Sequence, residues 1–275
     1  MNPHAPQSVQ PLAMVASVYK NRDLIFNLIK REVMGRYRGS AMGLLWSFFN
    51  PVFMLIVYTF VFSVVFKARW IGGSDSKVEF ALVLFTGLLV FNLFSEVINQ
   101  APSLILNNAN YVKKVIFPLE ILPVVALGAA AFHMSVSLVV WLIFFLLFFT
   151  LPDWTVLQLP LVLIPLILMT LGLAWLLASL GVYLRDVGQV IGLVTMALMF
   201  LSPIFYPVAA LPVEYQSIMH LNPLTYIVED TRNVMIWGKG INWSLWCYWT
   251  ALSTLIAWLG FAWFQKTRKG FADAI

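Results

Sequence analysis

Long apolar runs alternate with short polar segments along the chain, and the runs are longer than an ordinary core helix needs. A helix that crosses about 30 Å of hydrocarbon, at about 1.5 Å per residue, needs about 20 apolar residues. Six runs are of this order, so we predict an all-α integral membrane protein with six transmembrane helices. The predicted spans are residues 45–66, 80–98, 121–149, 157–182, 187–207 and 243–264.

Lysine and arginine residues fall in the gaps between these runs and favour one side of the membrane. If the N-terminus is cytoplasmic, only five of the 17 basic residues lie on the outer side. Basic residues favour the cytoplasmic face, so we predict that both termini are cytoplasmic. The five outer basic residues are Lys67, Arg69, Lys77, Arg232 and Lys239.

The composition fits a membrane protein and argues against several other classes of protein. Charged residues make up 11% of the chain and apolar residues 61%, against roughly 25% and 45–50% in soluble domains. The net charge is +5, and the basic residues lie between the apolar runs. This placement favours contact with anionic lipid over contact with nucleic acid. The single cysteine, Cys247, gives no disulfide framework and no metal cluster, and the proline-rich first 11 residues do not resemble a signal peptide.

Three further segments are too polar to span. Residues 21–38 carry an apolar stripe with basic residues beside it, which predicts an interface helix that serves as an anchor or grips a partner. Residues 107–117 are expected to form a short cytoplasmic docking helix or a loop. The outer segment 203–243 is interrupted by prolines. In this segment Asn222 and Pro223 indicate the start of a helix and Gly238 indicates its end. We predict two short helices that act as a gate; the alternative is a capping loop with no gating role.

Catalytic motifs are missing from the sequence. There is no GxxxxGK[ST] phosphate loop, so the chain cannot hydrolyse ATP by that route, and no HExxH or GxSxG occurs either. His133 is the one ionisable residue deep in a predicted span, and Glu96 is expected near a helix end. We interpret a lone histidine of this kind as a packing or hydrogen-bonding residue rather than a proton relay. Any energy for transport is therefore expected to come from another subunit.

Aromatic residues make up 15% of the chain and crowd the first and fifth predicted spans. They face lipid or line a path for sugars, whose rings stack on aromatic faces. Tyr58 and Phe62 are four residues apart and share a helix face. We favour this pair with Tyr206, because lipid cannot satisfy a tyrosine hydroxyl. The candidate lining residues are Tyr58, Phe62, Phe49, Phe53, Phe200, Phe205 and Tyr206.

Five motifs in order resemble one family. They are KREVMGRYRGSAMGLLWSFFNPVFMLIVYTFVFSVVF (30–66), NYVKKVIFPLEILPV (110–124), YLRDV (183–187), LSPIFYP (201–207) and LNPLTYIVEDTRNVM (221–235). Together they resemble the permease subunits of ABC transporters that export bacterial polysaccharides, especially O-antigen exporter permeases, with teichoic acid exporter permeases as relatives. The resemblance covers one transmembrane domain, residues 21–275, and leaves residues 1–20 unplaced.

The resemblance implies a homodimer in the bacterial inner membrane, paired with two nucleotide-binding subunits that bind ATP and magnesium. Its substrate would be a glycan carried on undecaprenyl pyrophosphate. The alternatives are an exporter of teichoic acid, capsule, lipid or drug on the same scaffold, and, less favoured, a channel or a membrane-embedded transferase. The implied ATPase contacts are Tyr111, Lys113, Lys114, Arg185 and Asp186, and the implied outer-gate residues are Tyr215, Asn222, Pro223, Glu229 and Arg232.

Overall fold

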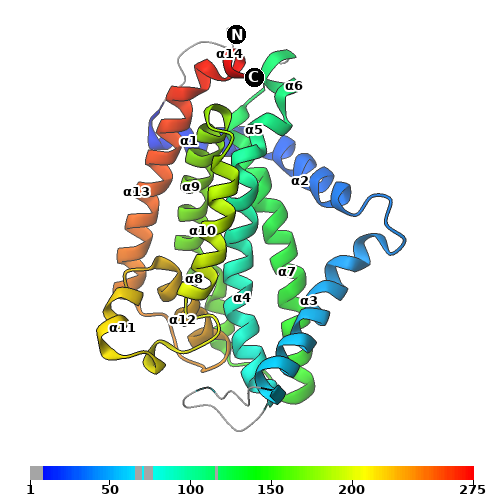
Figure 1. Ribbon diagram of the computed structural model, residues 1–275, viewed down its shortest axis with the longest axis vertical. Helices are drawn as coiled ribbons and strands as arrows, with labels where there is room; N and C mark the ends of the chain where they lie inside the picture. The colour runs from blue at the N-terminus through cyan, green and yellow to red at the C-terminus, as the bar shows by residue number, and fades with distance from the viewer. Residues whose placement is uncertain (1–8, 66–69, 71–76, 115–116) are drawn as a thin grey trace.

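The computed structural model describes residues 9–65, 70, 77–114 and 117–275, without the side chains of Ser63, Lys77, Lys113 and Lys114. Every regular element in these ranges is helical, and the long helices run side by side in a bundle (Figure 1). The helices are α1 (Pro11–Lys20), α2 (Arg22–Arg36), α3 (Trp46–Tyr58), α4 (Lys77–Gln100), α5 (Leu104–Asn107), α6 (Ala109–Lys114), α7 (Leu122–Phe148), α8 (Leu159–Val162), α9 (Ile164–Tyr183), α10 (Val187–Leu201), α11 (Val213–Met219), α12 (Pro223–Met235), α13 (Trp243–Thr267) and α14 (Phe271–Ala274).

Five helices within the described residues are long and apolar enough to cross a membrane, and each overlaps one predicted span. The predicted fifth span, residues 187–207, is helical only as α10. Its 15 residues rise about 22 Å, which falls short of about 30 Å of hydrocarbon. Helix length therefore supports five spans rather than six. The five are Gly43–Phe62, Val78–Asn107, Leu119–Phe148, Trp154–Tyr183 and Trp243–Ala274.

Helix α4 lies at the centre of the bundle and α3 at its edge. In the most apolar 18-residue stretch of α4, 83% of the residues are buried, against 6% in the stretch that includes α3. Figure 1 shows α3 leaning away from the bundle at its N-terminal end. Between α2 and α3, Gly39 (φ 85°) and Gly43 (φ 52°) adopt the left-handed conformation that favours glycine. The chain thus turns sharply before α3 begins.

The short helices gather at the two ends of the bundle. Figure 1 shows α1, α2, α5, α6 and α14 towards one end, and α8, α11 and α12 at the other. The segments expected in the cytoplasm therefore share one end, and the segments expected outside share the opposite end. Which end faces the cytoplasm stays a prediction from the distribution of charge.

Helix α2 matches the predicted interface helix, although its buried stripe is narrower than the sequence suggested. Ile25, Leu28 and Val33 are buried, whereas Leu24 keeps 36% of its surface exposed. A side chain on Gly128 of α7 would overlap the Ile29 side chain, so this glycine allows α2 to seat closely on α7. The unplaced tail also contains structure that we did not predict, because residues 11–20 form α1.

Helices α9 and α13 cross with their backbones in contact at Gly172 and Gly260. A Cβ on Gly260 would overlap the carbonyl oxygen of Gly172, and a Cβ on Gly172 would lie 2.5 Å from the carbonyl oxygen of Ile256. Small residues at such crossings let helices approach closely, and this contact drives helix association in lipid. The crossing holds α13, the last span, against the bundle.

Replacing Gly260 by alanine should therefore destabilise the protein by roughly 1–3 kcal/mol, because backbone atoms cannot move aside for the added methyl group. Unfolding of the purified protein in mild detergent, titrated with dodecyl sulfate, measures the change. Gly192→Ala on α10 is the matched control, since nothing lies within 4 Å of its Cβ position, and it should be neutral or slightly stabilising. Equal stability of the two variants would contradict the close crossing.

Candidate functional site

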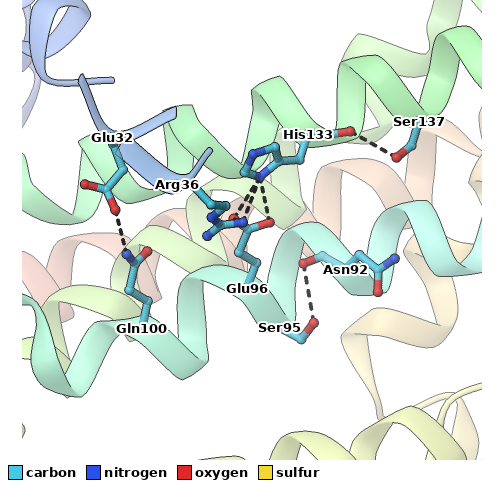
Figure 2. A network of polar contacts seen from close by, with 8 residues as sticks. All are labelled: Glu32, Arg36, Asn92, Ser95, Glu96, Gln100, His133 and Ser137. Carbon is cyan, nitrogen blue, oxygen red and sulfur yellow. Dashed lines mark hydrogen bonds and ion pairs between the residues drawn. The ribbon is translucent and has the colours of Figure 1, made fainter. Parts of the chain in front are cut away.

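An ionic cluster of Arg36, Glu96 and His133 joins α2, α4 and α7 (Figure 2). Arg36 Nη1 lies 2.7 Å from Glu96 Oε1, and His133 Nδ1 lies 2.9 Å from the same oxygen. One turn along, Gln100 Nε2 donates to Glu32 Oε1 at 3.0 Å. Residues four apart on a helix share a face, so the two contacts lie beside each other and hold α2 against α4.

The contacts of His133 favour one arrangement of its ring protons. Arg36 Nη1 lies 3.2 Å from His133 Nδ1, but a guanidinium group can only donate. The consistent assignment has Nδ1–H donating to the Glu96 carboxylate. In the neutral ring Nε2 then carries the lone pair, and this atom is buried without a partner among the described residues.

The ionic cluster shows that His133 is a hydrogen-bonding residue and that it is not a lone ionisable group. Glu96 lies near the end of α4, as expected, since the helix ends at Gln100, and 37 residues separate Glu96 from His133 in the sequence. Ionisable groups within a membrane protein persist when they pair with one another. The pairing depends on the packing of α4 beside α7, which residue spacing does not reveal.

Four of the predicted lining residues form an aromatic row: Tyr58, Phe62, Phe205 and Phe200. The ring centroids of Phe62 and Phe205 lie 5.4 Å apart in a stacked arrangement, and those of Phe205 and Phe200 lie 5.6 Å apart. Tyr58 lies 6.5 Å from Phe62 on the same face. The row therefore runs from α3 to the end of α10. Phe205, which we had not favoured, stacks on Phe62, while the Tyr206 hydroxyl donates to the Phe200 carbonyl at 2.8 Å.

Two other aromatic candidates point elsewhere. Phe49 and Phe53 on α3 are 45% and 61% exposed, so they face lipid or a second copy of the chain.

Two cavities lie beside α3. Phe144 and Phe148 of α7, which were not among the candidates, line an apolar cavity of about 290 Å³ between α3, α4 and α7. A polar cavity of about 350 Å³ lies between the same three helices, and its wall includes the ionic cluster and Tyr58.

The segment 107–117, expected to be a docking helix or a loop, contains the short helix α6. Tyr111 stacks on Phe117 with ring centroids 4.3 Å apart, and Arg31 Nη1 donates to the Tyr111 hydroxyl at 2.7 Å. The side chains of Lys113 and Lys114 lie outside the described residues. Arg185 and Asp186 are exposed at the corner between α9 and α10, at the same end of the bundle. This end thus presents α6 and the corner together, with α2 in contact with α6.

The connection between α10 and α13 contains the two predicted short helices, α11 and α12. Asn222 caps α12 by accepting from Leu224 N at 3.0 Å, with Pro223 in the first turn, as predicted. The positive φ of Gly238, 61°, confirms the stop after α12. Tyr215 on α11 is 56% exposed, whereas α12 is largely buried and Glu229 is only partly exposed. Burial raises the pKa of Glu229.

Arg232 fixes α12 to the bundle. It was counted among the outer basic residues, yet only 2% of its surface is exposed. Its guanidinium donates to the carbonyl oxygens of Val83, Pro203 and Ile204 at 3.1, 2.5 and 2.8 Å, and it lies over the Trp70 ring. Burial lowers the pKa of Arg232 to about 9, so the group stays charged at neutral pH. Arg232 therefore joins α12 to α4 and to the end of α10.

No group of three or more His, Cys, Asp or Glu residues is placed to hold a metal ion in the part of the chain that the structure describes. The polar features are instead the ionic cluster, the polar cavity beside the aromatic row, and the α6 end. A cavity between helices is a common place for a small-molecule site.

Comparison with known proteins gives one family. A family model described as ABC-2 type transporter matches residues 23–236. The O-antigen export system permease protein RfbA of Myxococcus xanthus is 27% identical over 266 residues, which cover 96% of this chain and 100% of that protein. A protein of the same name from Klebsiella pneumoniae is 23% identical over 92% of this chain and 95% of its own length. The polysialic acid transport protein KpsM of Escherichia coli is 24% identical over 77% of this chain and 80% of its own length.

Replacing Arg232 by methionine should lower stability by about 3 kcal/mol, because three buried carbonyl groups lose their donor. The measurement is again the unfolding midpoint in mixed detergent. Lys239→Met, at an exposed position in the same connection, is the control and should change stability by less than about 0.5 kcal/mol. An Arg232→Met protein as stable as the control would show that α12 is held by other contacts.

Proposed function

The chain belongs to the ABC-2 type transporter family, and from this membership we propose that it is the membrane subunit of an ATP-driven polysaccharide exporter. The proposed cargo is an O-antigen-type glycan linked to undecaprenyl pyrophosphate, moved across the bacterial inner membrane. The observation that carries the proposal is the match along almost the whole chain to a protein named as an O-antigen export permease. The chain itself is a multi-pass membrane protein without a phosphate loop in its sequence.

We propose that two copies of the chain form the path for the glycan. Helix α3 and helix α10 both expose large apolar side chains, including Phe53 and Ile56 on α3 and Leu193 and Met196 on α10. Lipid or a second copy can cover such faces, and pairing of the two copies there would place two aromatic rows around one path. In that arrangement α10 and the residues after it act as the sixth span, supported by the partner.

We propose that ATP is hydrolysed by two separate nucleotide-binding subunits, which bind the ATP and magnesium and dock at the end that carries α6. The Arg31–Tyr111 hydrogen bond links α6 to α2, and α2 in turn is tied to α4 through Arg36 and Glu96. Movement of α6 by a partner is therefore passed to the centre of the bundle by direct contacts. Arg185 and Asp186 offer a second contact at the same end.

We propose that α11, rather than α12, forms the outer gate. The guanidinium group of Arg232 donates hydrogen bonds to three carbonyl groups. Moving α12 would therefore break several buried hydrogen bonds at once. Helix α11 has no such anchor in the described part of the chain, and Val213, Tyr215 and Ile218 are exposed. We propose that α11 moves while Asn222 and Pro223 mark its fixed end.

Deleting the gene in its host and measuring surface glycan tests the proposal. We expect lipid-linked glycan to accumulate inside the cell and surface glycan to be lost. The wild-type chain, supplied on a plasmid, should reverse both changes. Unchanged surface glycan would reject the proposed cargo. Accumulation of a teichoic acid, a capsule polymer, a lipid or a drug in its place would select the alternative exporter on the same scaffold.

Tyr58→Ala and Phe62→Ala should each lower glycan export severalfold, because both rings belong to the aromatic row. Export is measured as surface polymer per copy of folded permease in the complemented deletion strain. Phe144→Ala and Phe148→Ala on α7 are the controls, because they also replace an aromatic ring by a methyl group. They should reduce export less than the two variants in the aromatic row. Equal effects at all four positions would indicate ordinary packing roles for the aromatic residues.

A cysteine at position 111 should cross-link to the nucleotide-binding subunit, because Tyr111 lies on α6 at the proposed docking end. Cross-linked product is read on a gel after oxidation of membranes that contain a single-cysteine permease and its ATPase. The matched control places the cysteine at Tyr215 on α11, at the opposite end, where no product is expected. Replacing Lys113 and Lys114 by glutamate should weaken assembly, and normal assembly would argue against docking on α6.

A further inference from the structure

The wall of the polar cavity presents polar side chains that make no hydrogen bond to the residues that the structure describes. They include the amides of the exposed residues Asn50 and Asn92 and the hydroxyls of the half-buried residues Tyr37 and Tyr58. Figure 2 shows the Asn92 amide directed away from Glu96, with no contact to the other residues drawn. The groups come from α3, from α4 and from the residue after α2, so three separate segments bring them to one space.

The exposed amides are open to an occupant of the cavity. Asn92 itself is exposed, although it lies between the buried residues Phe91 and Leu93 on the central helix. An apolar occupant would leave such amides without a partner, which costs about 1–3 kcal/mol per amide by mutational measures. An occupant that hydrogen-bonds therefore suits this cavity better than an apolar one.

The charged groups of the cavity favour an uncharged occupant. Among the described residues of its wall, Arg36 and Glu96 are the arginine and the carboxylate, and they bond to each other at 2.7 Å. The arginine therefore has a carboxylate partner already in place. An anionic group such as a phosphate would compete with Glu96 for Arg36 and would lie near the Glu96 carboxylate.

The size and the remaining chemistry of the cavity fit a sugar ring. Its volume of about 350 Å³ is at the lower end of the roughly 300–1,000 Å³ of small-molecule pockets. The amides and the phenol can both donate to and accept from hydroxyl groups. The Tyr58 ring and the side chains of Pro51 and Met54, also in the wall, offer apolar surface to the C–H face of a ring.

We propose that the polar cavity binds a single uncharged sugar residue, with Asn50, Asn92 and Tyr58 as hydrogen-bonding groups. The inference rests on the proposed export of a glycan and adds a glycosyl site within each copy of the chain. Tyr58 belongs both to this wall and to the aromatic row. A sugar that passes along the row therefore meets the cavity at Tyr58.

Binding is measured by saturation-transfer NMR on the purified full-length chain in lipid nanodiscs. The probes are the methyl glycosides of glucose, galactose, mannose, rhamnose and N-acetylglucosamine. At least one glycoside should receive saturation from the protein. Asn50→Leu and Asn92→Leu should weaken its binding about tenfold each, since each removes a hydrogen-bonding amide. Absence of transfer to all five probes would overturn the inference.

Two controls separate binding from folding and from anion capture. Asn99→Leu changes the same residue type on α4, where the amide oxygen instead accepts from the Thr195 hydroxyl at 2.8 Å, and it should leave glycoside binding unchanged. Asn92→Leu should be at least as thermally stable as the wild type, because it removes an unpaired amide. Inorganic pyrophosphate should not displace the glycoside, and displacement would show an anion site instead.

The export assay distinguishes failure of this inference from failure of the proposed function. If export requires the chain but Asn50→Leu and Asn92→Leu bind glycosides and export glycan like the wild type, the cavity is only hydrated and the inference falls. If deletion of the chain leaves surface glycan unchanged, the proposed function falls whether or not a glycoside binds. Reduced export by both variants, with Asn99→Leu normal, is the outcome we expect.

Discussion

The hydrocarbon core of a membrane satisfies no polar group, and this constraint decides which parts of the bundle are fixed. Arg36 reaches the central helix α4 through the Glu96 carboxylate, and Arg232 reaches it through the Val83 carbonyl. Each of these cations ties a short helix to the same long one. Helix α3 has no tie of this kind, because the hydroxyls of Ser47 and Thr59 donate only to carbonyls of its own segment. Thus α2, α4 and α12 form a framework, and α3 lies against it.

The sequence predicted those parts of the fold that depend on neighbours along the chain. Runs of about 20 apolar residues mark helices of spanning length, and the Asn222-Pro223 start and Gly238 stop of α12 follow from local backbone preferences. The fifth predicted span was too long because the residues after Leu201 stay apolar, while prolines at 203 and 207 prevent the helix from continuing. Apolar character alone does not distinguish a helix from the connection that follows it.

The site residues were harder to predict because their partners are distant in the sequence. Glu96 and His133 each looked unpaired until α4 and α7 were placed side by side. In the same way Phe205, rather than the favoured Tyr206, stacks on Phe62, since the chain bends between α10 and α11. Arg232 looked like a surface charge because helix α12 is short and polar in composition. Spacing rules describe one helix at a time, whereas these contacts each join two.

The two left-handed glycines before α3 set the angle at which this helix leaves α2. Gly39 and Gly43 have open space around their Cβ positions, so their positive φ rather than crowding favours glycine there. The two polar contacts between α2 and α4 lie before this bend, whereas one wall of the polar cavity is carried by α3 and another by α4. The width of the cavity therefore depends on the backbone conformation of two glycines that take no part in its wall.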